Sequence, residues 1–446
     1  MKGDLTRLSA VDAAENIRAG RLSSEALTAA CLMRIDETEN AIKAWAHVQP
    51  EQALAQAREA DRIRKSGRAI GPLHGVPVGL KDIIDTSDMP TARGSAIFDG
   101  RQPETDATLV ERLREAGAVI MGKTKTTELA FVHPTDTTNP HDATRTPGGS
   151  SSGSAAAVAA RHVPLAIGTQ TNGSVIRPAS FCGVFGFKPT NGVVSRHGLL
   201  QTSVSLDQVG GFGRSIQDVA LLIDAIGSYD QRDSLSFARP RPRMLTGARA
   251  DAPVKPDIAW FDLPINDQLD ADAREGIDAV IDALGPRIHR FDAAEQFSDL
   301  ISVQQTIHQY EICQHQAKVF TDHWDLISPA LQAIVEQGRA ITKDQYEDAI
   351  AVKSSADTFF ADFFNDFDAI LAPSATGQAP LISAGGTGNP IFCTIWTLAG
   401  LPSLSMPLLV GENDLPIGVQ LIGAKEEDDR LLRTASWVQT ALMAQD

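Results

Sequence analysis

Apolar and polar positions in the first half of the chain follow the two periods of regular secondary structure. Residues 8–66 carry helical spacing, and residues 52–64 are rich in Ala, so we expect the chain to begin with helices. Farther on, short apolar runs alternate with helical segments. Ala107–Ala116 and Ser154–Ala160 predict helices, and Ala118–Met121 predicts a buried strand. Strands interleaved with helices predict an α/β sheet.

The second half of the chain shows a different pattern. Residues 228–257 are rich in Arg, Pro, Asp and Ser, a composition typical of an exposed connection between a front and a back half. Residues 267–364 predict mostly helix. Strands are expected again at residues 368–373, 401–409 and 417–422, and a final helix follows them.

Composition and charge restrict the class of protein. With 446 residues and 43% hydrophobic side chains, the chain is long enough for a large core. The formal net charge of −16, from 56 acidic and 40 basic residues, comes without a block of Lys and Arg, which argues against nucleic acid or an anionic membrane as a partner. We find no signal peptide and no apolar run of about 18 residues, and therefore expect a soluble, cytoplasmic protein. The cysteines are far apart and form no CxxC pair, which favours reduced thiols over zinc or disulfides: Cys31, Cys182, Cys313 and Cys393.

One short motif suggests nucleotide binding. Residues 117–124 spell the phosphate-binding loop of nucleotide-binding proteins. In a working loop of this kind the residues between the glycines form an open turn, whereas Ala118–Met121 is an uninterrupted apolar run. The match therefore predicts a strand more strongly than it predicts a nucleotide site.

A second motif would make Ser151 the nucleophile of an α/β-hydrolase. Residues 149–153 spell the G-x-S-x-G turn, which requires a strand directly before it. Residues 138–147 form a polar, proline-containing loop instead. A further interpretation is that the serines cap the helix that starts near Ser154.

A lysine and two serines are better candidates for nucleophilic catalysis. Lys81 lies in an apolar run, and a lysine removed from water can be neutral enough to take a proton from serine. Ser150 follows two glycines, and Ser174 ends the small, turn-forming sequence 168–174. Consecutive amides in such a turn can hold an oxyanion, and its Asn-Gly pair tolerates left-handed backbone angles. The alternative interpretation is an ordinary strand-to-loop turn.

These segments together closely resemble the amidase signature family. The resemblance is carried by Lys81 in its apolar run and by residues 147–160 and 168–190, with matching spacing. It extends along nearly the whole chain, through residues 72–82, 205–209, 220–224, 399–403 and 418–423. It implies an α/β fold made of a single large domain, in which a central mixed β-sheet is flanked by helices. It also implies an amide hydrolase that requires no metal and no cofactor.

The resemblance implies a role for each candidate residue. Ser174 matches the acyl-accepting serine, Ser150 the relay serine that the family holds through a cis peptide bond, and Lys81 the base. The oxyanion site matches the backbone amides of four consecutive residues, Thr171, Asn172, Gly173 and Ser174. Because the ordinary pKa of lysine is about 10.4, the scheme requires Lys81 to be buried and within relay distance of Ser150.

Several positions depart from the usual family pattern, among them Ser152, which stands where Gly is usual, and Thr397, which lies in a stretch where the common pattern differs. Gln170 stands where Asp is usual, Asn172 where Gly is usual, and Arg177 lies three places after the nucleophile instead of two. We expect the detailed pocket to differ for this reason, with Gln170 and Arg177 as supporting or substrate-binding residues and Ser151 as a helper at best. Further candidates for the pocket are Phe131, Phe392, Trp396 and the helical stretch 304–315.

Three function hypotheses remain. The leading one is hydrolysis of a carboxylic amide, with aryl amides, carbamates and esters as candidate substrates. The second is the amidase subunit of a tRNA-dependent amidotransferase, and the remote third is the nucleotide-binding protein suggested by residues 117–124. The lack of an evident basic surface favours the first. Its expected partner is a small-molecule amide, with no nucleic acid, no membrane and a homodimer as the one candidate assembly.

The chain shows no internal repeat and no low-complexity tract. We predict one amidase signature domain over residues 1–446. Its predicted segments are an N-terminal helical segment (1–66), a signature core with the catalytic residues (67–227), a variable, mostly helical region on the substrate side (228–365), and C-terminal strands and a helix that complete the core (366–446).

Overall fold

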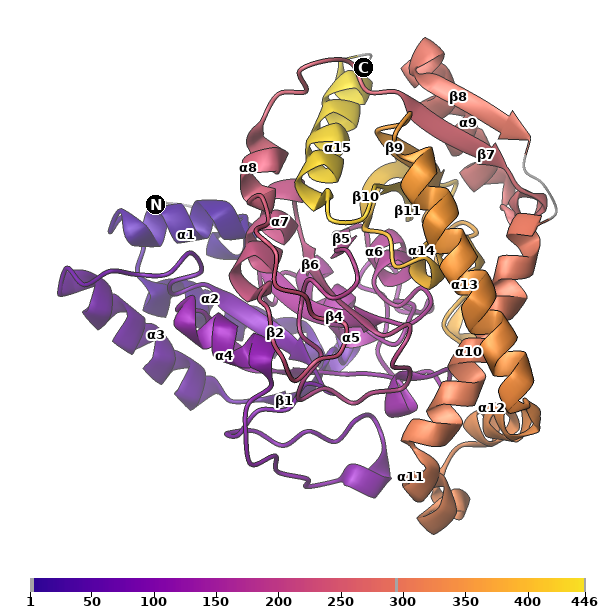
Figure 1. Ribbon diagram of the computed structural model, residues 1–446. Helices are drawn as coiled ribbons and strands as arrows, with labels where there is room; N and C mark the ends of the chain where they lie inside the picture. The colour runs from indigo at the N-terminus through magenta and orange to yellow at the C-terminus, as the bar shows by residue number, and fades with distance from the viewer. Residues whose placement is uncertain (1–3, 293–295, 445–446) are drawn as a thin grey trace.

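An eleven-stranded β-sheet runs through this computed structural model, which describes residues 4–292 and 296–444 (Figure 1). In sheet order the strands are β1 (Trp45–Val48), β3 (Val119–Thr124), β2 (Pro77–Lys81), β4 (Leu165–Gln170), β6 (Gln208–Gly213), β5 (Phe185–Lys188), β10 (Ser403–Val410), β11 (Pro416–Ile422), β9 (Ala369–Pro373), β7 (Ile258–Asp262) and β8 (Ile288–Asp292). Strands β3, β2 and β4 run parallel, as do β9, β7 and β8, whereas the pairs between β4 and β9 are antiparallel. The mixed sheet expected from the family resemblance is confirmed.

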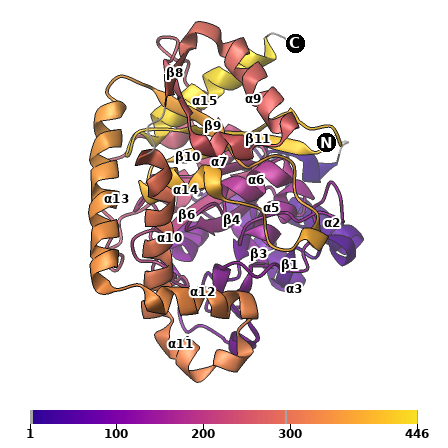
Figure 2. The same cartoon turned by 90° about the vertical axis from the view of Figure 1, so that its right-hand side faces the viewer.

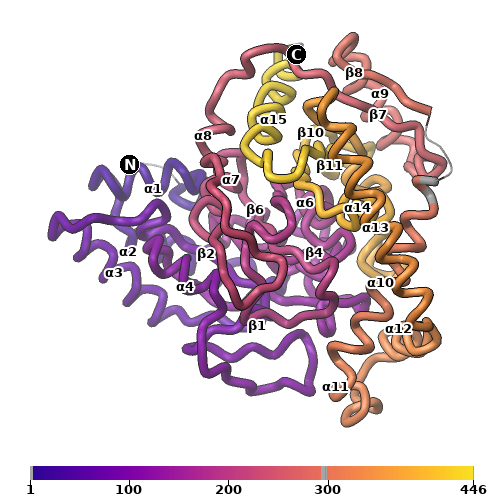
Figure 3. The backbone as a smooth tube through the Cα atoms, viewed as in Figure 1, coloured from indigo at the N-terminus to yellow at the C-terminus, as the bar shows by residue number. Residues whose placement is uncertain are grey.

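Helices flank the sheet, and the expected single-domain α/β architecture is confirmed. They are α1 (Ala10–Arg18), α2 (Ser24–Ile42), α3 (Pro50–Lys65), α4 (Thr108–Glu115), α5 (Ser152–Ala159), α6 (Ile176–Cys182), α7 (Ile216–Ile226), α8 (Met244–Arg249), α9 (Ala271–Leu284), α10 (Gln296–His315), α11 (Ala317–Asp322), α12 (Pro329–Ala340), α13 (Lys343–Phe363), α14 (Ile391–Leu398) and α15 (Asp428–Met443). Figure 3 traces the chain from α1–α4 beside one end of the sheet to β7 and β8 at the other. Helices α10, α12 and α13 form one flank of the molecule (Figure 2).

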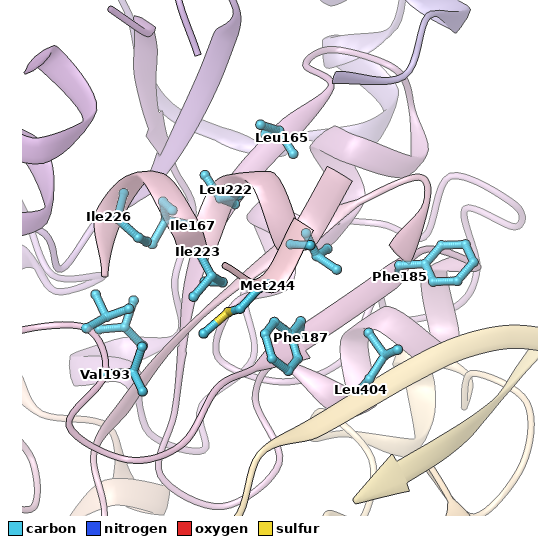
Figure 4. Close-up of a cluster of buried hydrophobic side chains, with 14 of the residues drawn as sticks. Leu165, Ile167, Phe185, Phe187, Val193, Leu222, Ile223, Ile226, Met244 and Leu404 are labelled. Atoms are coloured by element: carbon cyan, nitrogen blue, oxygen red, sulfur yellow. The ribbon is translucent and has the colours of Figure 1, made fainter. Parts of the chain in front are cut away.

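The central strands are buried on both faces, which explains their nearly continuous apolar sequences. Every residue of β2, β3 and β4 is buried. Side chains alternate between the two faces of a strand: in β4, Leu165 and Ile167 belong to one core cluster and Ala166 to another. Figure 4 shows part of the first of these clusters, with labelled residues of β4, β5, α7 and β10 together with Val193 and with Met244 of α8.

Several elements expected from the sequence are found. Ala107–Ala116 contains α4, and Ala118–Met121 lies in the buried strand β3. The amides of β3 pair with strands on both sides, so they do not form the open turn that a phosphate loop requires. The expected exposed connection, residues 228–257, contains α8, in which Met244 and Ala248 are buried.

Other expectations need adjustment. The mostly helical stretch 267–364 also contains β8, and residues 293–295 within it lie outside the described residues. The helix expected at Ser154 begins at Ser152, and Ser151, at its N-cap position, makes no side-chain capping bond. The predicted division of the chain into four segments stays a prediction. Within the described residues, no helix combines the length and the apolar character needed to cross a membrane.

Sheet topology determines where a site can form. Strands β2 and β4 are parallel neighbours, with Val78 opposite Leu165 and Leu80 opposite Ile167. Their carboxyl ends therefore reach the same edge of the sheet, the usual location of ligand sites in open α/β sheets. Lys81 is the last residue of β2, and the loop that carries Ser174 follows β4 directly.

Candidate active site

The amine of Lys81 is buried inside the protein. Its side chain is fully buried, and its Nζ donates hydrogen bonds to Ser150 Oγ (2.7 Å) and Thr169 Oγ1 (2.8 Å). No salt bridge reaches this amine within the described residues. Burial lowers the pKa of Lys81 to about 7, and the carboxylate of Asp207 offsets this only in part. The lysine can therefore be neutral near physiological pH.

Ser150 lies in a tight turn before α5. Gly148 and Gly149 have φ angles of +85° and +63°, in the left-handed region that favours glycine. A Cβ atom on Gly148 would lie 2.5 Å from the ring of Phe181, so this position also lacks space for a side chain. The backbone N–H of Ser150 donates to Ser174 Oγ (3.0 Å). The turn therefore links both serines with Lys81.

The cis peptide bond implied by the family resemblance is not found. All peptide bonds in residues 4–292 and 296–444 are trans. Trans is the lower-energy form for a peptide bond that does not involve proline. In this structure, the two glycines with positive φ give the chain its sharp turn at Ser150.

The loop that carries Ser174 joins β4 to α6. Gln170 Oε1 accepts hydrogen bonds from the backbone N–H groups of Val175 (2.8 Å) and Ile176 (3.0 Å) at the start of α6. The neutral side-chain amide of Gln170 therefore accepts two hydrogen bonds that a carboxylate at this position could also accept. Asn172 and Gly173 tolerate left-handed backbone angles, but neither residue has a positive φ in this loop.

The side chain of Ser151 binds the backbone of β4. Its Oγ donates to the carbonyl oxygen of Thr169 (3.1 Å) and accepts from the N–H of the same residue (3.2 Å). Because the hydroxyl is buried and doubly bonded to the backbone, its role in the described structure is to hold Thr169 beside Lys81. This contact does not match the nucleophile interpretation of the G-x-S-x-G motif.

A cavity of about 220 Å³ opens onto Ser174. Its lining includes Phe131, Arg177, Gln304 and His308. The rings of Phe131 and His308 lie 4.4 Å apart between centroids. Removal from bulk water lowers the pKa of His308 to about 4, so this imidazole is neutral near pH 7. The cavity wall therefore combines one aromatic face with polar groups from α10.

Arg177 is a buried cation without a carboxylate partner in the described part of the chain. Its side chain is 5% exposed, and its Nη1 donates to the carbonyl oxygens of Thr387 (2.6 Å) and Gly388. Its Nε has no hydrogen-bond partner in that part of the chain. Burial lowers the pKa of Arg177 to about 10, which still leaves it charged near pH 7. An uncompensated charge beside a cavity favours an anionic ligand.

Two expected pocket residues are not brought to this cavity. Phe392 and Trp396 lie one helical turn apart on α14 and pack into a separate apolar region with Phe261 and Leu263. Residues four apart share one helix face, and this face of α14 packs in the core. Thr394 and Thr397 of the same helix instead contact the loop before Ser174.

Two residues near the site have no assigned role in the sequence-based expectations. Thr169 provides the second acceptor for Lys81. Asp207 accepts hydrogen bonds from Thr171 Oγ1 (2.5 Å) and from the N–H groups of Thr202 (2.8 Å) and Ser203 (2.9 Å). The sequence pointed to Asp207 only because residues 205–209 resemble the family, and the folded structure is needed to show what Asp207 contacts.

Comparison with known proteins gives consistent matches over the chain. The model of the amidase family matches residues 26–432. A glutamyl-tRNA(Gln) amidotransferase subunit of Natranaerobius thermophilus is 33% identical, over 98% of this chain and 96% of the relative. The peptide amidase of Stenotrophomonas maltophilia has a TM-score of 0.83 at 30% identity, over 97% of this chain and 96% of that chain. A solved structure described as a vestigial protein complex that reveals the evolutionary origins of an s-triazine catabolic enzyme has a TM-score of 0.91 at 29% identity, over 97% and 98% of the two chains.

These comparisons correct the expected partners. The expected partner was a small-molecule amide, with a homodimer as the one candidate assembly, and the missing block of Lys and Arg argued against nucleic acid or a membrane. The relative from N. thermophilus is named as one subunit of an enzyme, and its name includes a tRNA. The expectation of a small-molecule partner alone, without nucleic acid, is therefore wrong, because the net charge of one chain does not report on what a larger assembly binds.

We expect kcat/KM for amide hydrolysis to rise as the pH increases through about 7 and then to level off. Below the pKa of Lys81, the protonated amine cannot accept a proton, and above it the neutral amine can. The measurement is a profile of kcat/KM from about pH 5 to about pH 9. The rate of inactivation by a sulfonyl fluoride should follow the same titration, and a profile that stays flat between about pH 6 and about pH 8 would contradict this assignment.

Proposed function

Because the chain belongs to the amidase family and is an amide hydrolase of that family, we propose that it cleaves a carboxylic amide through an acyl-enzyme on Ser174. Ser150 and Lys81 form the proton relay in this scheme. The observation that carries the proposal is the contact of 2.7 Å between the buried Lys81 Nζ and Ser150 Oγ, next to Ser174. Hydroxyl nucleophiles need such a neighbouring base, since the free group is a weak nucleophile.

Acylation starts from the neutral form of Lys81. The charged amine donates to Ser150 Oγ and to Thr169 Oγ1; in the neutral form one N–H group keeps the bond to Thr169, and the lone pair accepts from the hydroxyl of Ser150. Lys81 takes the proton of Ser150, Ser150 takes the proton of Ser174, and Ser174 Oγ attacks the carbonyl carbon. The N–H groups of residues 171–174 stabilise the oxyanion. The amine then leaves with a proton that returns through the same relay.

Deacylation repeats these steps with water. A water molecule gives its proton to the relay and attacks the acyl carbonyl, which forms a second oxyanion intermediate. Collapse of this intermediate returns the proton to Ser174 and releases the acid. The net reaction is amide plus water to acid plus amine, and no group outside the chain is needed to balance it.

The unpaired charge of Arg177 supports an anionic acyl group in the substrate. Its guanidinium lines the same cavity as Ser174 and has no carboxylate partner in the described residues. A carboxylate in the substrate would compensate a charge that burial otherwise destabilises. Phe131 and His308 contribute two rings, tilted by 39° to one another, to the cavity wall, which supports aryl amides, carbamates and esters as the classes to test first.

A second candidate function comes from the named relatives. We propose as the alternative that this chain is the amidase subunit of an amidotransferase that acts on glutamyl-tRNA(Gln). Its support is the similarity to the corresponding subunits of such enzymes, at 33–34% identity over 95–99% of the chain. In this case, the same Ser174 chemistry would release ammonia from an amide within a complex.

Replacing Ser174 or Lys81 should abolish turnover. We expect Ser174→Ala and Lys81→Met to lower kcat by at least about 10³-fold, because each removes a group that acts in every step. The measurements are amide hydrolysis and mapping of the serine that a sulfonyl fluoride modifies. Ser174 should carry the label in the wild-type protein. A label on Ser151 would instead support the G-x-S-x-G interpretation and contradict this proposal.

Replacing Arg177 should change substrate preference. We expect Arg177→Met to raise KM for the half-amide of a dicarboxylic acid by about 10–100-fold, since a charged hydrogen-bond pair is lost. The methyl ester of the same half-amide serves as the neutral control, because it lacks the anion. Equal effects of the substitution on both substrates would show that Arg177 has a structural role only.

Purification separates the two candidate functions. The first predicts that the isolated chain hydrolyses simple amides at its full rate. The second predicts that activity rises at least about tenfold when the chain is isolated together with its partner polypeptides and supplied with glutamyl-tRNA(Gln). With an amide as the nitrogen donor and ATP to activate the carboxylate also supplied, conversion of glutamyl-tRNA to glutaminyl-tRNA by the assembly, measured with a radiolabelled amino acid, would decide for the second.

A further inference from the structure

Side chains from two helices hold the three residues before Ser174. The loop Thr171–Gly173 carries the predicted oxyanion N–H groups, and both carbonyl oxygens of its first two residues accept hydrogen bonds. The carbonyl of Thr171 accepts from Gln304 Nε2 on α10 (2.9 Å). The carbonyl of Asn172 accepts from Thr397 Oγ1 on α14 (2.6 Å). Neither donor belongs to the loop, so both contacts depend on tertiary structure.

These contacts fix the direction of two N–H groups. A peptide unit is planar, and in the trans form its C=O and N–H point in opposite directions. Holding the carbonyl of Thr171 therefore orients the N–H of Asn172, and holding the carbonyl of Asn172 orients the N–H of Gly173. Rotation of either peptide unit would break the bond to Gln304 or to Thr397.

The side chain of Asn172 makes a second connection between the same helices. Its Nδ2 donates to Gln304 Oε1 (3.2 Å), and its Oδ1 accepts from Thr394 Oγ1 (2.7 Å). Thr397 Oγ1 also accepts from Gln170 Nε2 (2.9 Å), and Gln170 in turn binds the N–H groups at the start of α6. Two of the departures from the usual family pattern, at residues 170 and 172, thus belong to one network.

We propose that Thr397 and Gln304 are positioning residues that preorganise the N–H groups of Asn172 and Gly173 for the oxyanion. This inference rests on the proposed acyl-enzyme mechanism. Preorganised donors contribute to catalysis because they need no reorganisation when charge develops in the transition state. The loop contains glycine and has no left-handed residue to define its shape, so the hydrogen bonds of the two helices perform that task.

The matched pair Thr397→Val and Thr397→Ser tests the proposal. Valine keeps the shape of threonine but lacks the hydroxyl, whereas serine keeps it. We expect Thr397→Val to lower kcat by about 10–100-fold, with KM within about twofold of wild type. This decrease in kcat is smaller than the largest decreases caused by removal of an oxyanion donor itself. Thr397→Ser should retain kcat within about threefold.

Thr108→Val controls for the loss of a buried hydroxyl. Thr108 is 4% exposed and makes the same kind of contacts, since its Oγ1 donates to Asp230 and accepts from Arg232. It lies on α4, outside the network described above. We expect this variant to lose thermal stability with kcat within about twofold of wild type.

Binding of a transition-state analogue separates positioning from a general structural effect. A trifluoromethyl ketone derived from the substrate forms a tetrahedral oxyanion on the serine. In Thr397→Val its Ki should rise by the same factor by which kcat/KM falls, while the Kd of a ground-state competitive inhibitor stays within about twofold. A Ki for the ketone that matches the wild-type value, or an equal loss in Thr397→Ser, would overturn the proposal.

Gln304→Met provides a second variant if Thr397→Val does not fold. Methionine has a similar length but cannot hold the carbonyl of Thr171. Because Gln304 also lines the cavity, the decisive quantity is the ratio of the ketone Ki to the Kd of the ground-state inhibitor, which should rise about tenfold. An unchanged ratio would overturn the proposal.

Ser174→Ala, measured in parallel, distinguishes failure of the acyl-enzyme mechanism from failure of the positioning role. An active Ser174→Ala protein would mean that the acyl-enzyme mechanism itself is wrong. An inactive Ser174→Ala protein together with fully active Thr397→Val and Gln304→Met variants would leave the mechanism standing and reject only the positioning role.

Discussion

The enclosure of the Lys81 amine between two hydroxyl groups is the interaction on which the candidate site depends. A charged amine in this position would lack the water that stabilises it, so burial favours the neutral base. A carboxylate in direct contact would reverse this effect. Asp207, the acid that raises the pKa of Lys81, instead has its oxygens bound by Thr171, Thr202 and Ser203. Through Thr171, the loop before Ser174 thus also donates a hydrogen bond to that carboxylate.

Sheet topology provides the geometry for this chemistry. Because β2 and β4 are parallel neighbours, Lys81 and the loop of Ser174 emerge at one edge, and the glycine turn before α5 brings Ser150 to both. Helices α10 and α14 then close around the loop from elements more than a hundred residues later in the chain. The sheet and the turn before α5 thus hold the groups proposed for proton transfer, and the later helices line the cavity and bind the loop.

The acidic charge argues against nucleic acid as a partner, whereas the similar amidotransferase subunits are named for an enzyme that involves a tRNA. The similarity is the stronger argument. A net charge of −16 limits what the surface of this chain attracts by itself. It does not limit what a complex of several chains binds, since another chain can carry the basic surface. The amidase chemistry is common to both candidate functions, so the features of the site around Lys81, Ser150 and Ser174 do not depend on which of them is correct.

The sequence by itself determined the family, the mixed α/β fold and the three residues of the proposed relay, because these depend on local runs and on motifs at fixed spacing. It also indicated that Gln170, Asn172 and Arg177 differ from the usual pattern. Only the tertiary structure decided what these residues contact: Asn172 meets Gln304 across 132 positions and Thr394 across 222. Likewise, Phe392 and Trp396 pack in the core because the orientation of α14 is set by long-range packing. Local patterns specify strands and turns, but the contacts of a side chain with distant segments arise only when the chain folds.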